Sequence, residues 1–194
     1  MEMIQKKSKP LIFIGTSKDA LNVGRAIQRE LDHEAEVWIW HQGTIRPTQS
    51  ILDGLLEQLK EVDFAAFILT PDDVVIKRGQ KIRVARDNVV FELGLMMGAL
   101  GPERTVFIVP RENPPDLLSD LAGIKPITYD IPQRANWQAA VGAACSTILE
   151  MLYELRKGHN VIVEPNKWVQ KFPKNYPISD LFLKKSSESE KDLF

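Results

Sequence analysis

Short apolar segments that alternate with longer amphipathic segments constrain the fold of this 194-residue chain more than any other feature. Five of these segments have the length and composition of buried strands: residues 11–15 (LIFIG), 36–40 (EVWIW), 64–70 (FAAFILT), 105–110 (TVFIVP) and 125–130 (KPITYD). Parallel strands need crossover connections, which are almost always right-handed. The pattern therefore predicts a flavodoxin-like, doubly wound α/β fold with a five-stranded parallel sheet.

The segments between these strands predict the helices. Apolar residues keep helical spacing from Asp19 to Leu31, and residues 50–62 (SILDGLLEQLKEV) predict an amphipathic helix. Residues 86–100 (RDNVVFELGLMMGAL) predict a third helix that is apolar on almost every side. A long C-terminal helix is predicted from Gln133 to Lys157, and Gly158 is its stop signal.

The two ends of the chain differ in composition from residues 10–157, which form the predicted domain. Residues 1–9 are expected to be a disordered N-terminus. After residue 158, prolines break any long element while apolar anchors are spaced along polar sequence, so residues 158–194 predict an extended arm or linker with a disordered end. Two interpretations of this arm stay open: packing on its own domain, or docking to another subunit or a missing domain.

Charge, cysteine content and the absence of certain motifs limit the partners, the compartment and the kinds of site that the chain can have. Lysine and arginine number 25 against 26 acidic residues, so no basic field favours nucleic acid or a membrane surface. The single cysteine, Cys145, lies among small residues and predicts a core thiol in a reducing compartment. The N-terminal apolar run is too short for a signal peptide or a membrane span, so the chain is expected to be cytoplasmic. The three histidines and one cysteine are scattered along the chain, so no metal site is expected. The sequence also contains no GxSxG or P-loop, so hydrolase-triad and ATPase functions lack their residues.

Candidate site residues follow the predicted strands, because ligands of open α/β sheets bind outside the carboxyl ends of the strands. Gly15, Thr16 and Ser17 precede a helix, where backbone N–H groups and hydroxyls suit a phosphate or a ribose. A simple turn capped by Ser17 explains these three residues equally well. Trp40 ends the second strand and is either a stacking surface or a core aromatic. Asp72 follows the third strand, as a cleft residue or a turn residue.

Glu92 needs an explanation, because the helix around it is apolar and burying an unpaired charge is costly. With Asn88 as the N-cap, Glu92 lies one residue past the position used in a capping box, and the two residues share a helix face. The alternative interpretation is a surface acid that complements the helix dipole. The preceding segment, expected to be a polar loop, offers cations that would pair with Glu92 or receive a phosphate: Lys77, Arg78, Lys81, Arg83 and Arg86.

Taken in order, four segments resemble the bacterial TIR-like domains of the TIR-STING and Pycsar-effector type. These segments are LIFIGTSKD, LDGLLEQLKEVDFAAFILTPDD, VARDNVVFELGLMMGALGPERTVFIV and DLLSDLAGIKPITYD, within about residues 10–130. The resemblance implies the TIR fold and an NAD⁺ glycohydrolase whose catalytic acid is Glu92. It also implies that Asp72 and the loop of Gly15, Thr16 and Ser17 line the nucleotide cleft.

The chemistry implied by this resemblance is consistent with a single acid. Cleavage between nicotinamide and ribose passes through an oxocarbenium-like transition state, which a carboxylate beside the ribose stabilises. Nicotinamide leaves as a neutral ring, so a second carboxylate is not required. NAD⁺ is then a substrate rather than a cofactor, and the product is ADP-ribose or a cyclic variant. Thr16, Ser17, Arg86 and Asn88 become candidate phosphate or ribose contacts, and Trp40 a candidate stacking surface.

The resemblance further implies control by assembly in antiphage defence. Such domains are generally weak alone and gain activity when they stack as homo-oligomers, with residues 41–49 contributing to the neighbour's site. A separate activator or a missing sensor domain is expected. Two other hypotheses stay open. One is a TIR-type scaffold that assembles without catalysis, and the other is a nucleoside deoxyribosyltransferase, which shares the fold type and a glutamate near the ribose.

Overall fold

The computed structural model describes residues 9–40, 55, 59, 61–121 and 123–158. The main sheet consists of five parallel strands: β1 (Leu11–Thr16), β2 (Glu36–Trp40), β3 (Phe64–Ile68), β6 (Thr105–Pro110) and β7 (Ile127–Tyr129). Their order is β2-β1-β3-β6-β7, as in flavodoxin-like sheets. The predicted fold class is confirmed. β3 and β7 are shorter than predicted. Pro126, which has no N–H donor, directly precedes β7, and Pro71 lies three residues after the last residue of β3.

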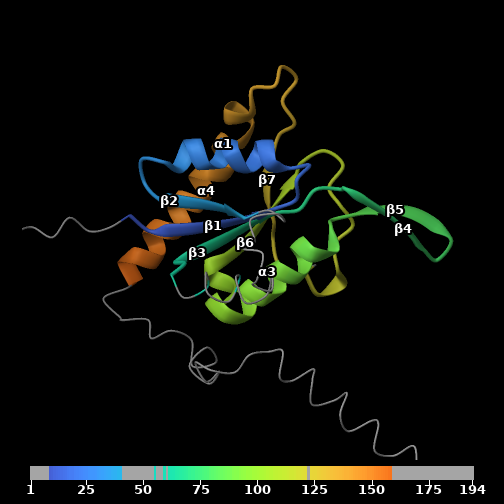
Figure 1. Cartoon of the computed structure of the whole chain (residues 1–194), viewed down its shortest axis with the longest axis horizontal. Coiled ribbons are helices and arrows are strands. Elements are labelled where there is room, and N and C mark those ends of the chain that lie inside the picture. Colours follow the sequence, from blue (N-terminus) through green and yellow to red (C-terminus); the bar gives the residue numbers. More distant parts are fainter. Residues whose placement is uncertain (1–8, 41–54, 56–58, 60, 122, 159–194) are drawn as a thin grey trace, which may run out of the picture. The chain divides into compact units, whose positions relative to one another are not determined.

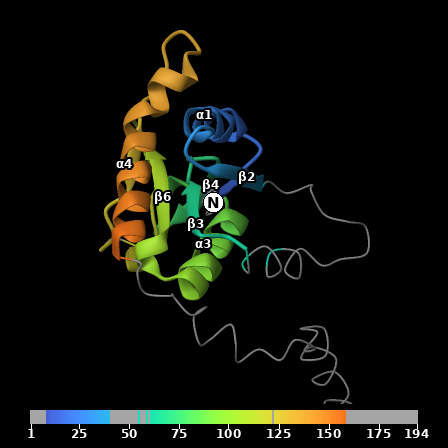
Figure 2. The same cartoon turned by 90° about the vertical axis from the view of Figure 1, so that its left-hand side faces the viewer.

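Helices cover both faces of this sheet (Figures 1 and 2). On one face, α1 (Leu21–Leu31) packs against α4 (Trp137–Gly158). On the other face, α3 (Asp87–Leu100) contacts β1, β3 and β6. Each face has its own buried core, so the sheet is doubly wound.

Alternation along β1 assigns its side chains to the two cores. Ile12 and Ile14 belong to the core under α1 and α4, whereas Phe13 belongs to the core under α3. Gly15 continues the α3 side, where it pairs in register with both Trp40 and Phe67. A Cβ at Gly15 would lie 2.3 Å from the Phe67 ring. Packing between neighbouring strands therefore requires a glycine at this position.

The segment between β3 and α3 corrects the prediction of a polar loop. β4 (Asp73–Lys77) and β5 (Gln80–Val84) form a separate antiparallel sheet that projects beyond the main sheet (Figure 1). Arg78 (φ 52°) and Gly79 (φ 80°) form its turn, and two positive φ values are typical of a type I′ hairpin. Apolar β-branched residues on both sides of Arg78-Gly79 were the missed signal, because the many cations favoured a loop.

The start of α3 also differs from its prediction. Arg86, which has extended backbone angles (φ −58°, ψ 130°), is the N-cap, and Asn88 is already inside the helix. The prediction of Asn88 as the N-cap is therefore wrong. α1 and α4 begin two and four residues later than predicted, at Leu21 and Trp137. α4 ends at Gly158 and includes the buried thiol of Cys145, as predicted.

Several predictions fall on residues outside the described part of the chain. These include the N-terminus, residues 41–49, most of the helix over 50–62, and the arm after Gly158. Leu55 and Leu59 are described, and both are buried in the core under α3. Within the described ranges, no helix is long and apolar enough to span a membrane.

Candidate functional site

Glu92 is buried on the face of α3 that packs against the sheet. Its side chain is 4% exposed, and Val89, Leu93 and Met96 of the same helix are also buried. The interpretation of Glu92 as a surface acid at the helix terminus is therefore wrong. Burial raises the pKa of Glu92 above the ordinary value of 4.5, because the ionised form loses contact with water.

Trp40 gives the Glu92 carboxyl group a polar contact. Its indole Nε1 donates a hydrogen bond to Glu92 Oε1 over 3.1 Å, which favours the ionised form and lowers the pKa, although burial has the larger effect. The Trp40 ring packs at a tilt against Phe13, with 6.1 Å between the ring centroids. Phe13 in turn packs against Phe67 at 5.8 Å. This aromatic row on the sheet holds the indole in the position that orients the carboxyl group.

The contact with Trp40 places Glu92 beside the carboxyl ends of the strands. Trp40 is the last residue of β2 and pairs in register with Gly15, near the end of β1. In sheets of this order, ligands bind where the chain leaves adjacent strands toward opposite faces. β1 leads to α1 on one face, and β3 leads through the hairpin to α3 on the other. Glu92 is thus on the α3 side of this switch point.

Thr16 and Ser17 are buried and use their hydroxyl groups locally. Ser17 Oγ accepts a hydrogen bond from the N–H of Ala20 at 3.3 Å, which caps the turn that begins α1. Thr16 Oγ1 donates to the carbonyl oxygen of Ser17 at 3.2 Å. The Thr16 methyl group faces Gly24 of α1, so this side chain is on the opposite face of the sheet from Glu92. Both hydroxyl groups are therefore engaged in local hydrogen bonds in the described structure.

Arg86 joins three segments at the same end of the sheet. Its Nη2 lies 3.1 Å from Asp19 Oδ2, just before α1, and 3.5 Å from Asp73 Oδ1 in β4. Its Nε is buried without a hydrogen-bond partner, as is Thr70 Oγ1 after β3. An unsatisfied buried polar atom costs about 1–3 kcal/mol. Arg86 Nε and Thr70 Oγ1 are therefore two buried side-chain atoms that have no hydrogen-bond partner among the described residues.

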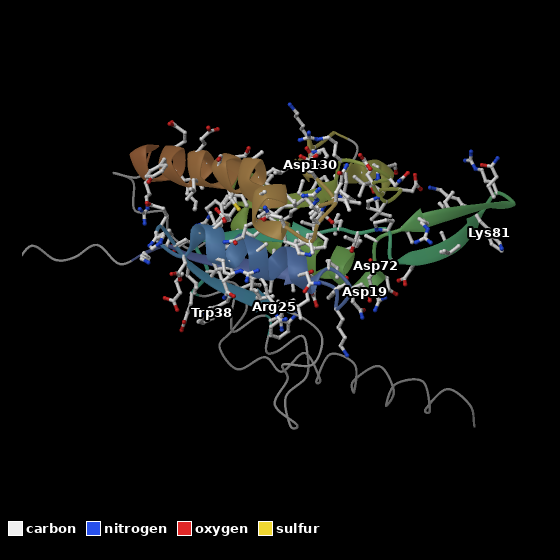
Figure 3. The ribbon with its side chains drawn as sticks, turned by 90° about the horizontal axis from the view of Figure 1, so that it is seen from above. Asp19, Arg25, Trp38, Asp72, Lys81 and Asp130 are labelled. Atoms are coloured by element: carbon white, nitrogen blue, oxygen red, sulfur yellow. The ribbon has the colours of Figure 1, made fainter. Side chains whose placement is uncertain are left out.

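The two remaining candidate residues lie near the surface. Asp72 is partly exposed after β3, and its N–H donates to the carbonyl oxygen of Thr70 at 2.8 Å. Burial, assisted by the negative charge of Asp72, raises the pKa of the Tyr129 hydroxyl to about 12. Figure 3 shows Asp72 and Asp19 at the same end of the sheet. Asn88 is exposed in the first turn of α3, one turn before Glu92.

The cations of the hairpin have contacts away from Glu92. Lys77 Nζ lies 3.1 Å from Asp116 Oδ2, and Arg83 donates to the carbonyl oxygen of Pro71 at 2.9 Å. Lys81 lies far out on the hairpin (Figure 3). Among the candidate cations, Arg86 is thus the one that the structure places at the switch point.

The structure adds residues that sequence reasoning did not connect. Asp19 and Asp73 bind Arg86, and Thr70 has a buried hydroxyl at the end of β3. Asp19 follows β1 and Asp73 follows β3, so their positions in the sequence were a signal for the ion pairs with Arg86. Nothing in the sequence distinguishes Thr70. In the described ranges, no three His, Cys, Asp or Glu side chains group so that they could hold a metal ion. The site therefore combines one buried carboxyl group, an indole N–H and a partly buried guanidinium.

Comparison with protein families relates the chain to bacterial effectors. A family model described as the TIR domain of CAP12/Pycsar effector proteins matches residues 11–131. The Pycsar effector protein PaPycTIR of Pseudomonas aeruginosa is 39% identical over 146 residues, which cover 74% of this chain and 47% of that protein. BcPycTIR of Burkholderia cepacia is 34% identical over 151 residues, which cover 77% of this chain and 50% of that protein.

A shorter match and a structural neighbour complete the comparison. CD-NTase-associated protein 12 of Flavobacterium daejeonense is 36% identical over 116 residues, which cover 60% of this chain and 37% of that protein. The chain thus spans half or less of the length of these three relatives. The diflavin flavoprotein A3 from Nostoc sp. superposes with a TM-score of 0.50 at 10% identity, covering 79% of this chain and all of that chain, which shows a shared fold alone.

Proposed function

Because the chain belongs to the family of CAP12/Pycsar effector TIR domains, we propose that it cleaves NAD⁺ between nicotinamide and ribose. Glu92 is the proposed catalytic carboxylate. The observation that carries this proposal is the burial of Glu92 in a hydrogen bond with Trp40 at the carboxyl end of the sheet. An acid with no structural partner other than an indole N–H among the described residues suits a role in chemistry rather than in packing.

The proposed reaction uses Glu92 in its ionised form. The bond between ribose C1′ and the nicotinamide nitrogen breaks, and both electrons leave with the neutral nicotinamide ring. Positive charge then grows on the ribose, where a nearby carboxylate stabilises it. Water adds to C1′ and loses a proton, which Glu92 accepts, and ADP-ribose is the product. Attack by the adenine ring in place of water would give the cyclic product.

The positive charge of the nicotinamide ring in bound NAD⁺ is expected to lower the pKa of Glu92. An opposite charge nearby favours the ionised carboxyl group, so bound NAD⁺ opposes the effect of burial on the pKa of Glu92. Arg86 is proposed to bind a phosphate through the guanidinium group that now pairs with Asp19 and Asp73. The backbone of residues 15–17 is proposed to contact the remaining phosphate or ribose oxygens.

Assembly and an activator belong to the same proposal. The chain spans half or less of its three compared relatives, so an activating sensor is proposed to lie in sequence beyond this domain or in another polypeptide. Stacked copies are proposed to be the active form in defence against phage. A rate of NAD⁺ loss that rises more steeply than protein concentration would support this arrangement.

A chromatographic time course tests the reaction against its alternatives. NAD⁺ is incubated with increasing concentrations of the chain, and nicotinamide, ADP-ribose and cyclic products are quantified. We expect nicotinamide to appear in step with the loss of NAD⁺. Assembly without loss of NAD⁺ would contradict the proposal and favour a scaffold. Exchange of the base in a parallel incubation of deoxyadenosine with a free base would instead indicate a deoxyribosyltransferase.

A further inference from the structure

The β4–β5 hairpin has apolar side chains that the described structure leaves uncovered. Val74 is 55% exposed, Val75 41% and Ile76 73%. The two strands form a sheet of their own, and a two-stranded sheet is marginally stable in water without further cover. Val84 of β5 bridges to Asp116, whereas within the described residues β4 has no strand on its outer side. The outer edge of β4 is therefore open to another strand.

The geometry of the turn identifies the free backbone groups. Lys77 and Gln80 flank the two-residue turn, so they form the hydrogen-bonded pair that closes the hairpin. Because backbone groups alternate in direction along a strand, Val75 also directs its N–H and C=O toward β5. Val74 and Ile76 direct theirs to the outer edge. These two outward residues are symmetric about Val75.

The sequence of β4 is complementary to itself when it is read in the opposite direction. In an antiparallel pair of DVVIK segments centred on Val75, Asp73 lies opposite Lys77 of the second copy, and Val74 lies opposite Ile76. Opposite charges thus face each other at both ends, with apolar residues between them. A parallel pair in register would instead place Asp73 beside Asp73 and Lys77 beside Lys77.

We propose that the outer edge of β4 pairs antiparallel with β4 of a second copy of this chain, centred on Val75. The pairing joins the two hairpins into one four-stranded sheet and covers Val74 and Ile76 at their edges. Lys77 and Asp73 also have intrachain partners, Asp116 and Arg86, but both side chains stay substantially exposed. The proposal concerns contact between copies and does not depend on cleavage of NAD⁺.

Cysteine crosslinking tests both the pairing and its centre. Val75 faces Val75 of the second copy in a non-hydrogen-bonded pair, for which a Cα separation of about 4.5 Å permits a disulfide. The native Cys145 is buried and does not compete. We expect Val75→Cys to give a disulfide-linked dimer under mild oxidation. Val74→Cys alone should stay monomeric, whereas a mixture of Val74→Cys and Ile76→Cys should crosslink. Equal crosslinking of all single variants, or crosslinking of none, overturns the proposal.

A charge exchange provides a second test, read out by light scattering during size exclusion. Lys77→Asp places two aspartates at each end of the pair, and Asp73→Lys places two lysines there. Each variant alone should self-associate at least about tenfold more weakly than the original chain. The two variants mixed together should associate with each other, because opposite charges again face. Unchanged self-association of Lys77→Asp, or no recovery in the mixture, contradicts the antiparallel pairing.

Discussion

Two opposing effects act on the pKa of the Glu92 carboxyl group. Burial in the core under α3 raises its pKa, and the hydrogen bond from Trp40 lowers it. A carboxylate that stabilises a growing positive charge must be ionised when the substrate is bound. In the proposed reaction, Trp40 is a positioning residue, since its indole donates to the carboxyl group and favours the ionised form.

Removal of the indole donor tests this role of Trp40. In Trp40→Phe, the pKa of Glu92 should rise further, so the acid limb of the pH–rate profile for NAD⁺ cleavage should move to higher pH. We expect a loss of about tenfold at pH 7 and a smaller loss at higher pH. Trp38→Phe is the matched control, because the Trp38 indole donates to Glu36 on the same strand. An unshifted acid limb in Trp40→Phe would show that the hydrogen bond does not tune Glu92.

The raised pKa of Glu92 also predicts how stability depends on pH. The folded state holds the proton of Glu92 more tightly than the unfolded state, so the stability associated with this group is present below the unfolded pKa and is lost as pH rises through the folded pKa. Glu92→Gln keeps an acceptor for Trp40 but carries no charge. Its midpoint of urea unfolding should exceed that of the original chain at pH 8, and this difference should shrink toward pH 4. A difference that is equal at both pH values would contradict the pKa assignment.

At the scale of elements, the switch point depends on close packing between β1 and β3. Gly15→Ala would force the Phe67 ring to move, since the new methyl group would lie 2.3 Å from it. We expect a loss of about 1–3 kcal/mol in the free energy of unfolding, measured by urea titration. Gly142→Ala in α4 is the control, because a Cβ there meets nothing within 4 Å, and alanine favours a helix by about 0.5–1 kcal/mol. A Gly15→Ala variant as stable as the original chain would refute the packing requirement.

The elements of the main sheet were predictable because their signal is local. Five apolar runs and the spacing of the intervening helices were enough for the fold class. The hairpin was not predicted, since the cations between residues 77 and 86 obscured two short β-branched strands. Its turn, Arg78-Gly79, is recognisable only once both flanks are read as strands.

Part of the site was predictable because its sequence signal is also local. An acid in an apolar helix is visible in sequence, so the sequence alone distinguishes Glu92 as unusual. The contact with Trp40 joins residues 52 positions apart, and the ion pair of Arg86 with Asp19 joins residues 67 positions apart. Such pairs depend on the order of strands in the sheet, which brings the carboxyl ends of β1, β2 and β3 together. The orientation of Thr16 toward α1 follows from the alternation of side chains along β1.

At the scale of the whole molecule, the site and the hairpin are connected through one residue. Arg86 is the N-cap of α3, which contains Glu92, and its side chain pairs with Asp73 at the start of β4. Contact between copies through β4 would therefore act on the segment that leads directly into α3, the helix that contains Glu92. This continuity gives assembly a physical route to the carboxyl group that we propose for catalysis.

The most direct test of the central claim compares nicotinamide release from NAD⁺ by the original chain and by Glu92→Gln at the same high protein concentration. Glu150→Gln, which changes an exposed acid on α4, is the matched control. We predict that Glu92→Gln loses at least about a hundredfold in rate while circular dichroism shows a cooperative unfolding transition, and that Glu150→Gln keeps the original rate. Equal release by the original chain and Glu92→Gln would contradict the role of Glu92.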